Sequence, residues 1–472
     1  MRRSFAVYLR STGIALLALT ALLCLRPAPP DDTLSFGKFG SVHVFHNTAH
    51  PQHVLLFVTG DGGWDIEATD MARTLAGTDS LVAGIDITIY LEQLAAGKDS
   101  CSYPAADFEM LSQYLQKRYG YANYVQPVLV GDSSGATLVY ATLAQAPPNT
   151  FRGAVSLGFR PDLPLDRPMC RGKGNLQGEP VLAGKGFRFL PAKDLPAPWV
   201  VFQRTGDQRG DSVEADTFIA QAGNASVVRL ARLAPGYSAD KYWLPQFLKT
   251  FHTLVGTQDD APQPATADLS GLPLIETPVQ SDNDTLAVVV TGDGGWASID
   301  RDLAAALNSK GIPVIGLDSL HYFWTPRTPE EMGRDMAHIL THYLAAWHKK
   351  KVLLVGYSRG ADVLPFIMTR LPEDLAARVS LIALLGVEHS IDFELSVADW
   401  LPESSAPAEY QVAPEVKKLA NRKVLCIYGA DETDTICPEL DKKTVNVIEM
   451  EGGHHFGGDY AKLAKIIMAE LR

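Results

Sequence analysis

The sequence predicts an α/β fold that occurs twice in tandem, each copy a mostly parallel sheet covered by helices on both faces. Three observations lead to this prediction. Short apolar runs without polar alternation are separated by helix-like stretches, which indicates parallel strands buried on both sides. Several strings of residues recur in the two halves, and a polar, proline-broken segment lies between them. The 472 residues also exceed what one ordinary core accommodates.

In the second half, strands and helices alternate in the order that such a sheet requires. Aliphatic and β-branched runs predict strands at 286–290, 313–317, 352–355, 380–386 and 424–428. Helix-like stretches over 299–310, 329–349 and 361–371 separate them. Strands connected through helices return in parallel, so the order predicts a doubly wound sheet.

The internal repeat extends over a whole domain. Thr59-Gly-Asp-Gly-Gly-Trp64 recurs as Thr291-Gly-Asp-Gly-Gly-Trp296, in each half directly after an apolar run. Gly131-Asp-Ser-Ser-Gly135 later parallels Gly356-Tyr-Ser-Arg-Gly360. Strings that recur in the same order indicate a duplicated structural unit.

The repeat and the composition together predict the domain boundaries. The segment 257–272 is polar and interrupted by prolines, which is typical of a linker. We therefore expect one domain at 31–256 and a second at 273–472.

Residues 1–30 resemble a secretory signal rather than part of either domain. Three arginines precede an apolar run over 14–25, which is the order of the charged and hydrophobic regions of a signal peptide. Arg26 and Pro27 interrupt the place of a small-residue cleavage site, so an uncleaved N-terminal anchor stays an alternative. Export is expected in both cases.

Four cysteines follow the leader, two in each half. An even count within each half of an exported protein favours the disulfides Cys101–Cys170 and Cys426–Cys437. Buried free thiols are the alternative. The sequence contains no CxxC motif and no Cys/His cluster, so we expect neither a structural metal nor a cofactor.

Composition and charge exclude several classes of function. With 46% hydrophobic and 20% charged residues, the chain has the composition of a globular protein. Its formal charge of -12 argues against a nucleic-acid partner, because phosphate binding requires a basic face. An acidic protein is better suited to a cationic or neutral substrate. The oligomeric state is not predicted.

The strongest chemical motif lies in the second half, where an apolar strand runs into Gly-x-Ser-x-Gly and then into a helix. This is the context of the nucleophile elbow of α/β-hydrolases, and it predicts Ser358 as the nucleophile. The Arg359 amide, which follows the nucleophile, is expected to form one half of the oxyanion hole. The glycine-rich turn after the early strand supplies the other half, through the amide of Asp293 or Gly294.

A serine nucleophile needs a histidine and a carboxylate, which follow it along the chain in the order acid and then histidine. A carboxylate-rich loop follows the strand at 424–428. In it we favour Asp434 over Asp431, because a proline stands four residues after Asp434. Two histidines follow the next apolar run. We favour His455, three residues after a glycine, and His454 is the alternative.

The first half repeats the elbow without a base. Ser133 occupies the nucleophile position, but no histidine occurs between His53 and His252. Tyr237 stands where His455 stands in the second half. We therefore expect the first domain to be catalytically inert and to bind, position or brace.

Several unusual strings of the second half, taken in order, resemble the AcvB/VirJ family of bacterial virulence proteins. They are the turn ending at Trp296, Leu317-Asp-Ser-Leu-His-Tyr-Phe-Trp324, the Ser358 elbow and Gly452-Gly-His-His-Phe456. The tandem arrangement is similar to that of the long, AcvB-like members.

The resemblance implies a periplasmic hydrolase that removes the amino acid from aminoacyl-phosphatidylglycerol, such as the lysyl or alanyl form. It places the family's serine, acid and histidine on Ser358, Asp434 and His455. The partner that it implies is an aminoacylated phospholipid at the membrane surface. The short VirJ-like members are tied to type IV secretion, which makes secretion-system proteins further candidate partners.

Two other functions stay open at this point, a periplasmic binding or assembly factor for a secretion apparatus and a general carboxylesterase or thioesterase. If the substrate is an aminoacyl ester, the carboxylates of an acidic stretch between two core strands could bind its protonated amine. These carboxylates are Glu388, Asp392, Glu394, Asp399 and Glu403.

Overall fold

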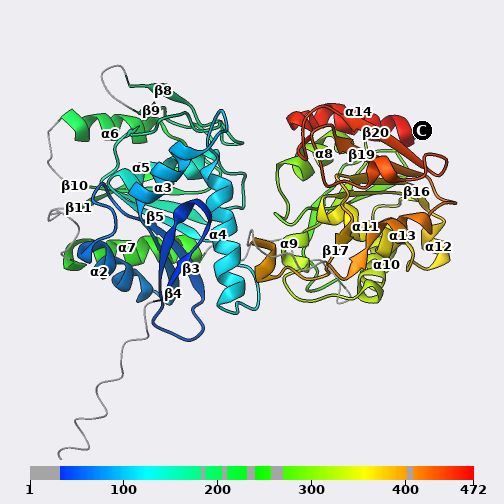
Figure 1. Ribbon diagram of the computed structural model, residues 1–472, viewed down its shortest axis with the longest axis horizontal. Coiled ribbons are helices and arrows are strands. Elements are labelled where there is room, and N and C mark those ends of the chain that lie inside the picture. The colour runs from blue at the N-terminus through cyan, green and yellow to red at the C-terminus, as the bar shows by residue number, and fades with distance from the viewer. Residues whose placement is uncertain are drawn as a thin grey trace, which may run out of the picture.

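The computed structural model describes residues 32–181, 186–204, 210–230, 240–256, 269–400 and 408–471. Two large sheets form, one in each half of the chain (Figure 1). The fold prediction of two tandem α/β units is therefore confirmed. The predicted leader and most of the predicted linker lie outside the described residues, so the domain boundaries stay predictions.

The first sheet has eight strands in the order β1-β2-β4-β3-β5-β6-β10-β11. In that order they span Asp32–Ser35, Ser41–Phe45, Ser80–Ile85, His53–Val58, Val128–Asp132, Gly153–Leu157, Trp199–Arg204 and Ala225–Leu230. Only the two pairings of β2 are antiparallel.

The second sheet has seven strands in the order β12-β14-β13-β15-β16-β19-β20. In that order they span Leu274–Thr277, Val314–Leu317, Thr285–Val290, Lys351–Tyr357, Val379–Leu385, Val424–Gly429 and Val445–Met450. Only β12 and β14 pair antiparallel. The five strands predicted from apolar runs correspond to β13, β14, β15, β16 and β19.

Helices connect the strands in both halves. The first half contains α2 (Ile66–Ala76), α3 (Ile87–Ala96), α4 (Pro104–Arg118), α5 (Ser134–Gln145), α6 (Gly210–Gln221) and α7 (Asp240–Val255). The second contains α8 (Ser298–Asn308), α9 (Ser319–Tyr322), α10 (Pro329–Ala346), α11 (Arg359–Met368), α12 (Glu373–Ala376), α13 (Val412–Lys417) and α14 (Tyr460–Leu471). None of the described helices is long and apolar enough to cross a membrane.

Helix α10 shows how local sequence sets an element's start. Thr328 accepts a hydrogen bond from the amide of Glu331, and the Glu331 carboxylate accepts one from the amide of Thr328. This reciprocal capping box satisfies two amides that the helix itself leaves without acceptors. Pro329 occupies the first helical position, where its fixed φ suits the helix and its missing N–H costs nothing.

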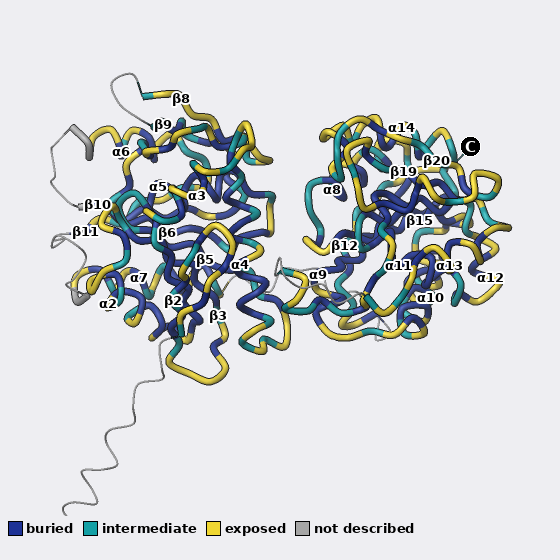
Figure 2. Tube along the Cα trace, viewed as in Figure 1, coloured by how far each residue is buried: buried dark blue, intermediate teal, exposed yellow. Residues whose placement is uncertain are grey.

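Each sheet has a hydrophobic core on both faces. Along β13, the side chains of Val288 and Val290 join the core under α10, α11 and α13, whereas those of Ala287 and Val289 join the core under α8 and α14. Successive side chains of a strand point to opposite faces, so an all-apolar strand needs cover on both. Figure 2 shows this layering, with buried strands inside and exposed residues on the outer helices.

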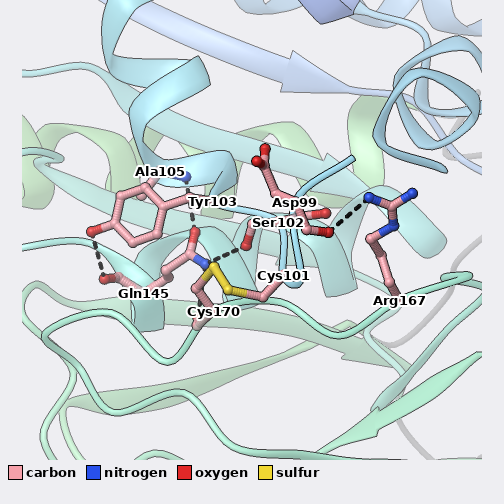
Figure 3. Close-up of a disulfide and its surroundings, with 8 residues drawn as sticks. All are labelled: Asp99, Cys101, Ser102, Tyr103, Ala105, Gln145, Arg167 and Cys170. Carbon is pink, nitrogen blue, oxygen red and sulfur yellow. Dashed lines mark hydrogen bonds between the residues drawn. A yellow bond between two sulfur atoms is a disulfide. The ribbon is translucent and has the colours of Figure 1, made fainter. Parts of the chain in front are cut away.

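Both predicted disulfides form, Cys101–Cys170 and Cys426–Cys437. The first lies just before α4 (Figure 3). Beside it the Gln145 side chain accepts a hydrogen bond from the Ala105 amide and donates to the carbonyls of Ser102 and Cys170. The start of α4 is therefore held by one covalent bond and three hydrogen bonds.

Candidate active site

The turn between β15 and α11 is the predicted nucleophile elbow. Ser358 adopts φ 52° and ψ -125°, a conformation that non-glycine residues rarely adopt. The flanking glycines permit the sharp turn. A Cβ on Gly356 would lie 2.2 Å from the carbonyl oxygen of Gly360, and a Cβ on Gly360 would lie 2.0 Å from that of Val290. The strained backbone holds Ser358 at the carboxyl edge of the sheet.

A glycine-rich turn after β13 lies directly beside the elbow. A Cβ on Gly292 would lie 3.4 Å from the Cβ of Ser358. The amide of Gly295 donates to the carbonyl of Gly292 at 3.1 Å, which leaves Asp293 and Gly294 at the tip of the turn. Arg359 opens α11, where an amide has no acceptor within the helix. The predicted oxyanion donors thus flank Ser358, and their role as donors stays a prediction.

The last residue of this turn is an anchor. Trp296 packs so closely on β14 that a Cβ on Gly316 would lie 2.3 Å from its ring. The Trp296 amide donates to Asp318, which also caps α9 by accepting from the His321 amide at 3.2 Å. In the first half, Trp64 packs on Gly84 in the same way. The repeated string therefore positions the turn as well as supplying its amides.

A histidine and a buried carboxylate meet at the ends of β19 and β20. Nδ1 of His454 is hydrogen-bonded to Oε1 of Glu432 at 2.5 Å, and Oε2 of Glu432 accepts from the amide of Gly429 at 2.5 Å. The Glu432 side chain is only 8% exposed. This hydrogen bond raises the pKa of His454 above its ordinary value.

The His454–Glu432 pair lies beside the strand that adjoins the nucleophile. Gly386, with φ 63°, directly follows β16, and a Cβ there would lie 2.8 Å from Cε1 of His454 and 3.1 Å from Oε1 of Glu432. The carbonyl of the preceding Leu385 accepts the Ser358 amide at 2.9 Å. Among the described residues, the Ser358 hydroxyl has no hydrogen bond to a histidine. The pair nevertheless stands next to the elbow.

The favoured pairing of Asp434 with His455 is not found. Nδ1 of His455 is hydrogen-bonded to the hydroxyl of Tyr357 at 2.8 Å, and burial lowers its pKa. The Asp434 side chain is 80% exposed and contacts Nδ1 of His389 at 3.1 Å. The reason is the turn after β19, in which the Glu432 amide bonds back to Gly429 and directs its side chain inward. Asp434, two residues later, is directed to solvent.

Sequence reasoning therefore named the histidine of the buried pair only as the alternative and missed its carboxylate. As candidates for the acid, only the aspartates Asp434 and Asp431 were weighed from the sequence, and Asp431 is also exposed. The one local signal for Glu432 is its place three residues after Gly429, the last residue of β19.

Residues 284–472 match the family model described as bacterial virulence protein (VirJ). The match covers the Ser358 elbow, the glycine-rich turn after β13 and the His454–Glu432 pair, but not the first half of the chain. We refer to these residues as the VirJ-matching domain. None of the curated proteins compared with the chain matches it.

Solved structures that resemble part of the chain include three with low sequence identity. A lipase-esterase related protein from Clostridium acetobutylicum is 18% identical over 42% of this chain and 99% of its own, with a TM-score of 0.32. XC6422 from Xanthomonas campestris, described as an α/β serine hydrolase without a lid, is 13% identical over 42% and 87%, with a TM-score of 0.29. An esterase domain from Rhodothermus marinus is 17% identical over 47% and 98%, with a TM-score of 0.31.

The elbow of the first half has different partners from that of the VirJ-matching domain. Ser133 has the same strained φ of 52°, but its hydroxyl donates to Asp61 at 3.2 Å and accepts from Arg160 at 3.4 Å. The segment containing Tyr237 lies outside the described residues. In the described part of this elbow, the serine is tied to an acid and a guanidinium rather than to a base.

Of the carboxylates named for the amine of the substrate, most are already engaged. Asp399 pairs with Arg359 at 3.4 Å, Glu394 pairs with Lys117 at 3.0 Å, and Asp392 accepts from a backbone amide. Glu403 lies outside the described residues.

Glu388 differs from the three engaged carboxylates, because its own carboxylate forms no hydrogen bond or ion pair within the described structure. Burial, and then the charge of Asp434, raises the pKa of Glu388, and His454 and Asp293 are among its other charged neighbours. The carboxyl group of Glu388 therefore lies within electrostatic range of His454 and Asp293. No cluster of three or more metal-ligating side chains occurs among the described residues.

Proposed function

We propose that the VirJ-matching domain is a serine hydrolase that cleaves the aminoacyl ester of aminoacyl-phosphatidylglycerol. Ser358 is the nucleophile, His454 the base and Glu432 the carboxylate that orients the base. The observation that carries this proposal is the hydrogen bond between His454 and the buried carboxylate of Glu432 at Gly386, beside the elbow of Ser358. In α/β-hydrolases, the same three chemical groups act together on esters.

In the first half-reaction, Ser358 attacks the ester carbonyl as His454 takes the hydroxyl proton on Nε2, because Nδ1 is bound to Glu432. The amides of Arg359 and of the Asp293–Gly294 tip stabilise the negative charge of the tetrahedral intermediate by hydrogen bonding. As the intermediate collapses, the glycerol oxygen leaves with the proton from His454. The amino acid stays on Ser358 as an ester.

In the second half-reaction, water attacks the acyl-enzyme. His454 accepts a proton from the water, the same amides hold the oxyanion, and the serine oxygen leaves with the proton returned by His454. The products are the free amino acid and phosphatidylglycerol. The carboxylate of Glu432 stabilises the imidazolium in both half-reactions.

The acidic surroundings of Ser358 support an aminoacyl group as the acyl part. An aminoacyl ester carries a protonated amine on the atom next to the carbonyl, so this charge must lie close to the nucleophile. Asp293 and Glu388 both lie close enough to His454 to raise its pKa, in addition to the larger effect of Glu432. Opposite charges in a partly desolvated site attract strongly.

The two disulfides support export, because such bonds persist in oxidising compartments such as the periplasm. A periplasmic location would place the enzyme beside its lipid substrate.

The decisive assay uses the purified full chain and vesicles containing lysyl- or alanyl-phosphatidylglycerol, with released amino acid as the readout. Wild-type protein should release the amino acid, and Ser358→Ala should lose on the order of 10⁶ in turnover. If both lipids stay intact while p-nitrophenyl butyrate is cleaved, the protein is a general esterase. If Ser358→Ala keeps full function in cells, the role is one of binding or assembly.

A further inference from the structure

Helix α4 of the first domain packs against the VirJ-matching domain, and Figure 1 shows it on the side that faces that domain. The Gln113 side chain accepts a hydrogen bond from the Trp400 indole at 3.0 Å. The Lys117 ammonium donates to the carbonyl of Trp324 at 2.7 Å and pairs with Glu394 at 3.0 Å. These contacts fix one face of α4 against two loops of the second domain.

The two domains also exchange aromatic side chains. Tyr124 is buried in the core of the VirJ-matching domain, with its ring 5.4 Å from that of Trp324 and 5.8 Å from that of His321. In return, Trp400 packs against the core of the first domain. Because apolar side chains of each domain lie in the core of the other, the interface is packed rather than merely touching.

The periodicity of α4 gives the direction of a third side chain. Glu109, Gln113 and Lys117 are four residues apart and share one helix face. Since Gln113 and Lys117 contact the second domain, Glu109 points the same way. Its charged neighbours across the interface are Asp293, at the tip of the oxyanion turn, and Asp318.

We propose that Glu109 of the first domain is a specificity residue of the second domain's active site, where its carboxylate binds the ammonium group of the aminoacyl substrate. This inference rests on the proposed function and adds to it the source of substrate recognition. It also gives the first domain, which we expect to be catalytically inert, a role in substrate recognition.

The main support is the position of Glu109 on the interface face of α4, where its carboxyl group interacts electrostatically with Asp293. Asp293 adjoins Gly292, where an added Cβ would lie 3.4 Å from the Cβ of Ser358. Glu109 is thus within electrostatic range of the turn where we propose that the ester carbonyl binds. Among the described residues, its own carboxylate makes no hydrogen bond or ion pair.

The electrostatics of the cluster agree with a cationic ligand. Burial, together with the charges of Asp293 and Asp318, raises the pKa of Glu109 to about 8. Tyr103 and Tyr124 are its titratable neighbours from the first domain. His321 lies near Asp318. Burial acts to lower the pKa of His321, but the hydrogen bond and charge of Asp318 outweigh it, so this pKa is raised. A bound ammonium would offset the repulsion among the three carboxyl groups.

The test compares Glu109→Gln with Glu92→Gln, a matched control on the exposed surface of α3 in the same domain. In the full chain, the ratio of kcat/KM for alanyl-phosphatidylglycerol to kcat/KM for p-nitrophenyl butyrate should fall about tenfold in Glu109→Gln, mainly through KM, since the lost contact involves a charged hydrogen bond. The ratio for Glu92→Gln should stay at the wild-type value. An unchanged ratio in Glu109→Gln would overturn the inference.

A binding measurement separates this inference from the proposed function. L-Alaninamide carries the ammonium and carbonyl of the alanyl substrate but no ester, and N-acetyl-L-alaninamide is its neutral counterpart. Calorimetry on the full chain should show that Glu109→Gln weakens the binding of L-alaninamide about tenfold relative to that of the neutral amide. If the wild-type protein cleaves no aminoacyl ester but Glu109→Gln still weakens binding of the charged amide selectively, the proposed reaction is wrong and the inference about Glu109 stands. If both amides are affected equally, Glu109 has a structural role and the inference is wrong.

Discussion

Nδ1 of His454 is hydrogen-bonded to Oε1 of Glu432 at 2.5 Å, in a site where Glu432 is almost fully shielded from solvent. A buried carboxylate bound to one ring nitrogen fixes the orientation of the imidazole and leaves the other nitrogen to exchange protons. This relationship, rather than the presence of paired histidines, distinguishes His454 from His455.

Replacing the two histidines separately should separate their roles. His454→Ala removes the base and should reduce turnover of aminoacyl-phosphatidylglycerol on the order of 10⁶-fold, like loss of the nucleophile. His455→Ala removes the hydrogen bond with Tyr357 and the ring contact with His454, and it should cost less than about tenfold. Release of the amino acid from vesicles measures both. The assignment is wrong if His455→Ala is the inactive variant.

The two acids of the loop after β19 offer a second matched pair. Glu432→Gln keeps the shape but loses the charge that stabilises the imidazolium, so kcat should fall about 10⁴-fold. Asp434→Asn changes an 80% exposed side chain and should leave kcat close to the wild-type value. Single-turnover kinetics on one substrate would show the contrast. Equal losses in the two variants would argue against Glu432 as the orienting acid.

The pH profile should report the effect of Glu432 on His454. Because the hydrogen bond raises the pKa of His454, the neutral base forms only at a pH above its ordinary value of 6.5. The acidic limb of kcat/KM should therefore lie above 6.5 in the wild type and move down in Glu432→Gln. A limb that stays in place in the variant would contradict this cause.

The same shift has a consequence for stability. A histidine with a raised pKa in the folded state binds its proton more strongly there than in the unfolded chain. The stabilisation from the His454–Glu432 pair is therefore complete below about pH 6.5 and is lost as the pH rises through the folded-state pKa. Urea unfolding across this range should show a wild-type stability that falls with pH more steeply than that of His454→Ala.

Gly386→Ala should inactivate the protein by displacing the His454–Glu432 pair. The new methyl group would stand 2.8 Å from Cε1 of His454, so the ring must move. The matched control is Gly120→Ala, which has a similar φ of 71° but nothing within 4 Å of the new Cβ. Both substitutions should cost about 1–2 kcal/mol of unfolding free energy from backbone strain. Only Gly386→Ala should abolish ester cleavage, and equal activity in the two variants would contradict the assigned position of His454.

The two disulfides should differ in how much each stabilises the fold. Replacing Cys101 and Cys170, which are 69 residues apart, should cost about 4 kcal/mol. Replacing Cys426 and Cys437, which are 11 residues apart, should cost about 3 kcal/mol, because the closed loop is shorter. Denaturant titrations of the two double Cys→Ser variants would measure this. A larger loss for the shorter loop would show that entropy of the unfolded chain is not the main cause.

The parts of the site that could be predicted from the sequence have local signatures. The strand before Ser358, the flanking glycines and the following helix are contiguous, so the elbow follows from one short string. The choice between Glu432 and Asp434 depends instead on the direction of side chains in a short turn, which has no periodic pattern. Glu109 lies in the other domain, and only the packing of α4 reveals its relation to Asp293.

The disulfide at the start of α4 links the fold of the first domain to the substrate recognition that we propose for the second. Cys101–Cys170 and the Gln145 hydrogen bonds hold the first turn of the helix whose second turn carries Glu109. Reduction of this disulfide should therefore weaken the substrate discrimination that we propose for Glu109 by no more than Glu109→Gln does. Oxidation in the first half would then adjust substrate selection in the second half without being required for the chemistry at Ser358.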